Sequence, residues 1–129
     1  MHEFSTMQEI VNAIMEEAKK HNAIEISRVI IEIGELTFLG EEQLKFAFDI
    51  LKEGTIMENA DIVIKKVRAK IKCKCGYEGK AKYGLKDEFH IIFPILKCPK
   101  CGGDIEIVKG RECFIKSVEM EIPDVAVKR

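Results

Sequence analysis

The apolar residues of two stretches recur at helical spacing. In residues 5–22 an apolar side chain returns every three or four positions, and residues 40–54 repeat this spacing between acidic residues at the start and Gly54 at the end. Such spacing places apolar side chains on one face of a helix, and a glycine commonly ends one. We therefore expect two helices, each with one buried face. The expected buried residues are Met7, Ile10, Val11, Ile14 and Ala18 in the first helix and Leu44, Ala47, Phe48 and Leu51 in the second.

Three other stretches alternate between apolar and polar positions, which is the period of a β-strand. They are residues 23–36, 60–72 and 113–122. The alternation within 60–72 changes phase, so we expect a bulge near Lys65 and Lys66 inside one long strand. Three strands with two helices predict an α/β fold of the α+β type, built on a small three-stranded sheet.

The segment 73–110 interrupts this pattern. It contains four of the five cysteines, six of the nine glycines and two of the three prolines, and it shows little periodicity. We interpret it as a small zinc-ribbon-like module inserted between two strands of one domain. The predicted organisation is a domain formed by residues 1–72 plus 111–129 and an inserted module of residues 73–110.

The cysteines of the module form two pairs, each followed by a glycine. The first pair, Cys73 and Cys75, has the spacing C-x-C, and the second, Cys98 and Cys101, lies in C-P-K-C-G. Four thiolates suit zinc, and a four-cysteine zinc site is usually structural. A module this short buries little apolar surface, so metal binding would supply its folding free energy. No thioredoxin-like pattern supports a redox role. Cys113 could be an alternative ligand, but it opens a predicted strand, so we expect it to be a small core residue.

Composition and charge narrow the class of protein. The 129 residues are 47% hydrophobic and 33% charged, which is typical of a globular domain. No apolar run is long enough to span a membrane and no secretion signal is visible, so we expect a cytoplasmic protein with reduced thiols. The sequence contains neither a nucleophile motif nor a P-loop, so we expect no enzymatic activity.

The net charge of −1 conceals a basic middle segment. Residues 1–64 carry a net charge of −8, residues 65–86 carry +8 and residues 87–129 carry −1. The basic segment, with Tyr77 and Tyr83 as stacking groups, would suit a zinc-ribbon nucleic-acid-binding protein. It would equally suit docking to an acidic protein surface, and the acidic first half would repel phosphates.

The chain opens with Met1, His2 and Glu3. The Met1 amine, the His2 amide and the His2 imidazole could chelate one metal through adjoining five- and six-membered rings, and the Glu3 amide or carboxylate could complete a plane. Ni(II) and Cu(II) adopt such a plane, whereas zinc prefers a tetrahedron. The alternative is an ordinary histidine in a frayed chain end.

Taken together, several motifs resemble those of the HypA family, which are nickel metallochaperones of [NiFe]-hydrogenase and sometimes urease maturation. The resemblance rests on the M-H-E start, the strand "VIIEIGEL", the two helices, the cysteine pairs and the closing "KGRECFIKSVEMEI", and it covers nearly the whole chain. It implies an N-terminal nickel site in an α/β domain and a structural zinc site in the inserted module. The C-x-C pair departs from the C-x-x-C that is usual in the family.

The resemblance also implies ligands and partners. The nickel ligands would be the Met1 amine, His2 and Glu3, and His90 corresponds to a loop histidine that can join the nickel in archaeal members. The zinc ligands would be the four paired cysteines, Cys73, Cys75, Cys98 and Cys101. The implied partners are a nickel-loading GTPase similar to HypB and a hydrogenase large subunit that receives Ni(II).

Overall fold

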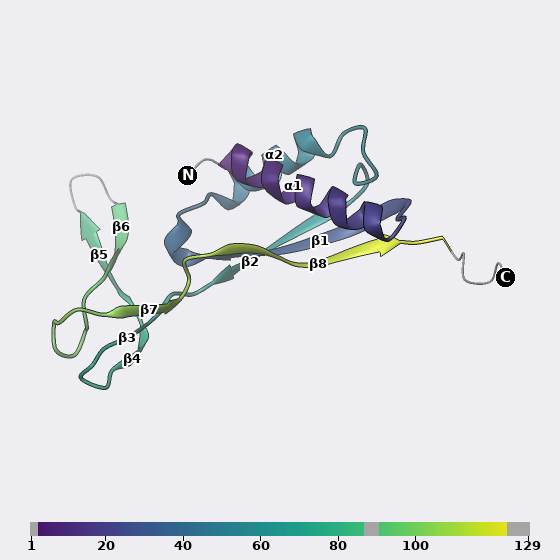
Figure 1. The fold of residues 1–129 in the computed structure, drawn as a ribbon. Helices are drawn as coiled ribbons and strands as arrows, with labels where there is room; N and C mark the ends of the chain where they lie inside the picture. The colour runs from purple at the N-terminus through teal and green to yellow at the C-terminus, as the bar shows by residue number, and fades with distance from the viewer. Residues whose placement is uncertain (1–2, 87–90, 124–129) are drawn as a thin grey trace. The chain divides into compact units, whose positions relative to one another are not determined.

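The chain folds into two compact units. A computed structural model describes residues 3–86 and 91–123 (Figure 1). Among these residues, the helix–sheet unit falls within Met1–Glu32, Leu39–Lys65 and Cys113–Arg129, and the cysteine unit falls within Ile33–Phe38 and Lys66–Glu112. The two units are defined by contacts within the fold. The division into a nickel-binding domain and a zinc module at residues 73 and 110 concerns function and stays a prediction. As packed, the cysteine unit begins earlier, at Lys66, and includes Ile33–Phe38.

The helix–sheet unit has the predicted α+β fold. Its three-stranded sheet has the order β2-β1-β8, with β1 at Glu25–Gly34, β2 at Asp61–Val67 and β8 at Cys113–Glu121. Strands β1 and β8 run antiparallel, because hydrogen bonds join Ile24 to Glu121 at one end and Gly34 to Glu112 at the other. Helices α1 (Glu3–Lys20) and α2 (Glu41–Leu51) lie on the same side of this sheet (Figure 1).

Both predicted helical faces lie in the core. All five predicted residues of α1 are buried, and in α2 Leu44, Ala47 and Phe48 are buried while Leu51 is half-buried. Helix α1 begins at Glu3, two residues before the predicted start, and ends with two lysines. An acidic residue at the start and basic residues at the end complement the helix dipole. In the part of the chain that the structure describes, no helix is both long and apolar enough to cross a bilayer.

The predicted long strand at residues 60–72 is wrong, because it is two strands in different sheets. Strand β2 ends at Val67, and β3 (Lys70–Lys72) pairs with β4 (Glu78–Lys80) and β7 (Glu106–Lys109). Between β2 and β3, the Ala69 N–H donates to Glu35 Oε1 at 2.7 Å. Glu35 belongs to the 3-10 turn η1 (Glu35–Thr37). Its carboxylate accepts the hydrogen bond of the Ala69 N–H, which in a continuous strand would go to a neighbouring strand.

Two glycines allow the backbone around this break to pack closely. A Cβ on Gly34 would overlap the Gly110 carbonyl group, and Gly110 has a φ of +110° with Ala69 directly beside it. The Gly34 N–H donates to the Glu112 carbonyl and the Leu36 N–H donates to the Gly110 carbonyl, both at 2.8 Å. Glycine at both positions removes the side chains that would separate these segments. The remaining strands, β5 (Lys82–Lys86) and β6 (Ile91–Ile95), form an antiparallel pair.

Candidate metal centres

Four cysteine sulfurs converge in the cysteine unit. The sulfurs of Cys73, Cys75, Cys98 and Cys101, here called the cysteine cluster, all lie within 4.8 Å of one another. The two loops face each other in pairs: Cys73 Sγ lies 3.5 Å from Cys101 Sγ, and Cys75 Sγ lies 3.6 Å from Cys98 Sγ. The structure therefore brings together all four cysteines that the sequence analysis selected, and the C-x-C pair reaches the same point as the C-x-x-C pair.

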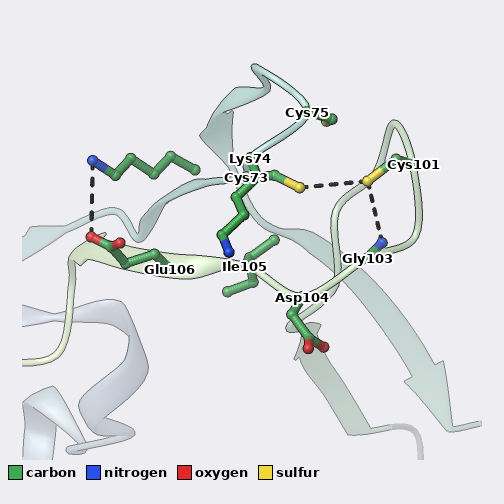
Figure 2. Close-up of a pocket in the computed structure, with 9 residues that line it drawn as sticks. Cys73, Lys74, Cys75, Cys101, Gly103, Asp104, Ile105 and Glu106 are labelled. Carbon is green, nitrogen blue, oxygen red and sulfur yellow. Dashed lines mark hydrogen bonds and ion pairs between the residues drawn. The ribbon is translucent and has the colours of Figure 1, made fainter.

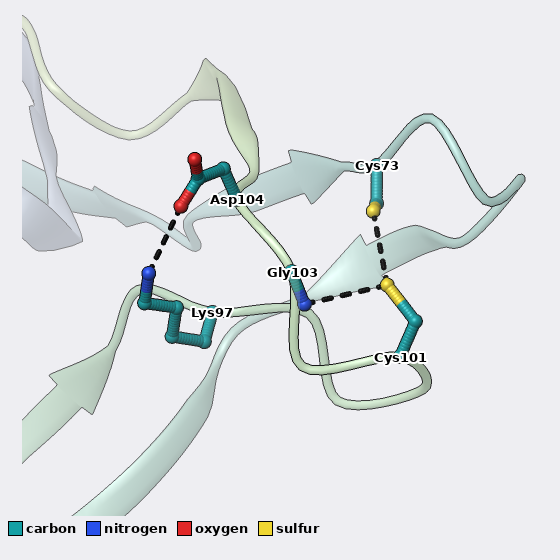
Figure 3. Close-up of polar contacts among 5 residues, drawn as sticks. All are labelled: Cys73, Lys97, Cys101, Gly103 and Asp104. Atoms are coloured by element: carbon teal, nitrogen blue, oxygen red, sulfur yellow. Dashed lines mark hydrogen bonds and ion pairs between the residues drawn. The ribbon is translucent and has the colours of Figure 1, made fainter.

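Backbone amides of the second loop point at its sulfurs. Cys98 Sγ accepts hydrogen bonds from the N–H groups of Lys100 and Cys101, at 3.3 and 3.4 Å. Cys101 Sγ accepts one from the Gly103 N–H at 3.4 Å (Figure 3). This turn closes through Gly102, whose φ is +76° and whose N–H donates to the Cys98 carbonyl. Such amides stabilise negative charge on sulfur.

The first loop is closed by a different turn. The Gly76 N–H donates to the Cys73 carbonyl, and the Cys73 N–H donates to the Tyr77 carbonyl. Gly76 has a φ of +103°, a conformation that a residue with a side chain rarely adopts. The glycine after the C-x-C pair thus lets the chain reverse directly behind Cys75.

The pKa values of Cys98 and Cys101 are shifted in opposite directions. Desolvation raises the pKa of Cys98, but hydrogen bonds to its sulfur outweigh this effect and lower that pKa to about 6. The Gly103 N–H lowers the pKa of Cys101, but the three neighbouring thiols outweigh it and raise that pKa to about 12. Cys98 therefore ionises readily, whereas its neighbours oppose a negative charge on Cys101. A bound dication would remove this opposition.

The cluster fits zinc. In a tetrahedral site with Zn–S bonds of about 2.3 Å, neighbouring sulfurs lie about 3.8 Å apart. The two closest pairs, at 3.5 and 3.6 Å, and the 4.8 Å limit for the whole cluster agree with that spacing. Because all four donors are sulfur, the site leaves no position for water, as is usual for a structural zinc.

Basic and acidic side chains both lie beside the cluster. A cavity of about 670 Å³ is lined by Lys72, Lys74, Asp104 and Glu106 together with three cysteines of the cluster (Figure 2). Near the second loop, Lys97 Nζ lies 2.9 Å from Asp104 Oδ1, and this hydrogen bond and charge lower the pKa of Asp104 (Figure 3). Lys72 is ion-paired with Glu106 and Lys97 with Asp104, so Lys74 is the lysine of this lining with no ion pair among the described residues.

Cys113 lies outside the cluster. It begins β8 in the helix–sheet unit and is half-buried, and burial raises the pKa of its thiol. A thiol in such a position behaves as a small apolar side chain.

The predicted nickel site is only partly within the described residues. Met1 and His2 lie outside them, as does His90. Glu3, the first residue of α1, is described: its Oε2 accepts a hydrogen bond from the Gly40 N–H at 2.8 Å. Sequence analysis missed this contact, because nothing in the local pattern relates residue 3 to residue 40.

Comparison with known proteins places the chain in one family. The family "HypA: Hydrogenase/urease nickel incorporation, metallochaperone, hypA" matches residues 1–120. The chain belongs to the HypA family. It is therefore a member of a family of nickel-incorporation metallochaperones, and the family, together with the cysteine cluster, supports nickel and zinc as its metals. The alternative, a zinc-ribbon nucleic-acid-binding protein, is not favoured.

Individual HypA proteins resemble the chain over almost its full length. The "Hydrogenase maturation factor HypA" of Methanothermobacter thermautotrophicus is 42% identical, over 96% of this chain and 100% of the relative. The protein of the same name in Methanosarcina acetivorans is 38% identical, over 94% and 96%. The solution structure of the Ni metallochaperone HypA from Helicobacter pylori has a TM-score of 0.65 at 25% identity and covers 95% of this chain and 100% of that one.

Replacing one cysteine of the cluster should release the metal. With Cys98→Ser, we expect the wild-type content of about one zinc per chain to be lost, because a four-sulfur site supplies every ligand from the protein. The cysteine unit should unfold while α1 and α2 remain, since metal binding supplies the folding free energy of such modules. Zinc content by plasma mass spectrometry and helicity by circular dichroism measure the two effects.

Cys113→Ser is the matched control. It removes a thiol of the same chain that lies outside the cluster, so zinc content should stay at the wild-type level. Equal loss of zinc in the two variants would contradict the separation of Cys113 from the cluster.

Proposed function

We propose that the chain binds Ni(II) at its first three residues and delivers it for hydrogenase maturation. The observation that carries this proposal is the family match, which begins at Met1 and describes nickel incorporation. The relatives named hydrogenase maturation factor support hydrogenase as the client enzyme. In this proposal nickel is the cargo of the protein.

The proposed nickel ligands are nitrogen atoms. They are the Met1 amine, the His2 amide and imidazole nitrogens, and the Glu3 amide. We choose the Glu3 amide over its carboxylate because the carboxylate is hydrogen-bonded to Gly40. Four nitrogens in a plane suit Ni(II). Protons compete with nickel for each of these nitrogens, so the site can bind the ion and also release it.

The Glu3 carboxylate then has a positioning role. Its bond to the Gly40 N–H, at 2.8 Å, joins the start of α1 to the residue before α2. A hydrogen bond that involves a charged group contributes about 1.5–3 kcal/mol. The contact fixes the position of Glu3, which follows His2 directly in the sequence.

The cysteine unit is proposed to hold one structural zinc through Cys73, Cys75, Cys98 and Cys101. Zinc would supply folding free energy there by compensating the charge of the four thiolates. His90 is proposed as an additional nickel ligand during transfer. We further propose that residues 1–72 plus 111–129 carry nickel and that residues 73–110 form the zinc module.

The proposed partners follow from what the sequence lacks. It contains no P-loop, so any nucleotide hydrolysis that drives transfer belongs to a partner, proposed here as a nickel-loading GTPase similar to HypB. The acceptor would be the precursor of a hydrogenase large subunit. These steps are proposed to take place in the cytoplasm, where thiols remain reduced, and the chain itself is proposed to act as a carrier without enzymatic activity.

Two changes at the terminus should abolish nickel binding by different routes. His2→Ala removes the imidazole, and an added N-terminal residue turns the Met1 amine into an amide while every side chain remains. Isothermal titration of untagged protein with nickel should show one site per chain that is lost in both variants. Binding should weaken as the pH falls through about 6.5, since the imidazole must be neutral to bind.

Zinc content serves as the control for both variants and should not change. If the extended protein binds nickel as tightly as the untagged protein, the amine is not a ligand.

A separate pair of variants tests the role of Glu3. Glu3→Gln keeps an oxygen acceptor for the Gly40 N–H and should bind nickel like the wild type. Glu3→Ala should still bind one nickel per chain, but its free energy of unfolding should fall by about 1–3 kcal/mol because the Gly40 N–H loses its acceptor. Nickel stoichiometry and denaturant unfolding measure these outcomes. Complete loss of nickel in both variants, with helicity intact, would show that the carboxylate is a ligand.

A further inference from the structure

Three lysines lie side by side across the sheet of the cysteine unit. In the antiparallel register, Lys70 of β3 is the direct partner of Lys80 in β4. It is also the partner of Lys109 in β7, where the register shifts between Lys70 and Ile71. In a regular pair such as Lys70 and Lys80, the side chains project from the same face of a sheet, with Cβ atoms about 5 Å apart. Lys80 and Lys109 are exposed, and Lys70 is half-buried. We call Lys70, Lys80 and Lys109 the lysine row.

The neighbouring row of the same sheet has paired charges. Two residues along β3, Lys72 is the direct partner of Glu78 in β4 and of Glu106 in β7, and Lys72 Nζ lies 3.9 Å from Glu106 Oε1. One row of this face is thus positive throughout, and the next alternates negative, positive and negative.

The lysine row is only weakly compensated. Lys70 Nζ lies 3.9 Å from Glu78 Oε1, along a diagonal of the sheet. Within residues 3–86 and 91–123, Lys80 and Lys109 form no ion pair. Like charges placed directly opposite one another destabilise a sheet. At Lys72 the sheet places opposite charges beside each other, but at Lys70 it places like charges beside each other. A local arrangement that does not favour folding indicates a function for these lysines other than stabilising the sheet.

The charge of the whole unit supports an anionic partner. The sequence ranges of the cysteine unit contain twelve basic and seven acidic residues, a net charge of +5, whereas those of the helix–sheet unit have a net charge of −6. The positive charge that the sequence analysis found in residues 65–86 therefore belongs mainly to this one unit. Its field would steer an acidic surface toward it.

We propose that the lysine row is a docking site for a protein surface that presents neighbouring carboxylates. A protein suits this face better than a nucleic acid, because phosphates that continued past the row would meet Glu78 and Glu106. A protein surface can instead place acidic residues against the lysine row and a basic residue against either glutamate. This inference rests on the proposed function, since it takes the docking protein to be a partner in nickel transfer.

The test compares two triple variants with the same change in charge. One replaces the lysine row by Lys70→Gln, Lys80→Gln and Lys109→Gln. The other, the control, replaces three lysines of the helix–sheet unit by Lys19→Gln, Lys20→Gln and Lys45→Gln. Wild type and both variants, as full chains loaded with zinc, are titrated with three probes. The probes are the purified nickel-loading GTPase, the hydrogenase large-subunit precursor and a single-stranded DNA of about 20 nucleotides.

We expect the lysine-row variant to bind at least one of the two proteins at least tenfold more weakly than the wild type, and the control to bind like the wild type. Wild-type binding should weaken as salt is raised, because salt screens exposed charges. The lysine-row variant should keep its zinc and unfold at the same temperature or a higher one, since the change removes repulsion within the sheet. A lower unfolding temperature together with lost zinc would assign the row a structural role and overturn the proposal.

The proposal is also overturned if both proteins bind the lysine-row variant like the wild type, if neither protein binds the wild type, or if only DNA binding depends on the row. Nickel titration of the same samples separates this failure from failure of the proposed function. A lysine-row variant that binds nickel and transfers it to the large-subunit precursor at the wild-type rate leaves the proposed function standing without the docking site. A wild-type chain that binds no nickel refutes the proposed function itself.

Discussion

The cysteine unit depends on the close approach of four sulfur atoms, whose negative charges would repel one another in the thiolate form. Two loops, one from each side of the unit, hold the sulfurs within 4.8 Å of one another, and backbone amides turn toward Cys98 and Cys101. This arrangement lowers the pKa of Cys98 to about 6 and raises that of Cys101 to about 12, and a cation bound to the sulfurs would favour the thiolate form of Cys101. Among the residues of this unit whose burial the structure describes, Ile33, Ala69, Ile71 and Ala81 are buried apolar side chains. A metal ion at the cluster would add to the folding free energy of this unit.

The chemistry of the ligands keeps the two metals apart. Zinc accepts four thiolates in a tetrahedron, whereas Ni(II) suits a plane of nitrogens that includes backbone atoms. The nickel ligands proposed above are nitrogens of Met1, His2 and Glu3, while the Glu3 carboxylate accepts a hydrogen bond from the Gly40 N–H. One site is thus suited to permanent occupancy and the other to release, since protons compete with the metal at every nitrogen.

Much of this account could be predicted from the sequence. Helical spacing identified the buried faces of α1 and α2, and cysteine spacing identified the four members of the cluster. The break between β2 and β3 was not predicted from the local pattern, since the Ala69 N–H there donates to Glu35, which is 34 residues away in the sequence. The contact between Glu3 and Gly40 was not predicted either, because these residues are 37 positions apart in the sequence. The lysine row required the strand register, since its members are far apart along the chain.

X-ray absorption of the protein loaded with both metals tests the central claim most directly, because it examines each metal separately. At the zinc edge we expect four sulfur neighbours at about 2.3 Å and no nitrogen or oxygen. At the nickel edge we expect only nitrogen or oxygen neighbours, in the planar geometry that such ligands favour. Sulfur bound to nickel, or nitrogen or oxygen bound to zinc, would contradict the separation of the two metals by ligand type.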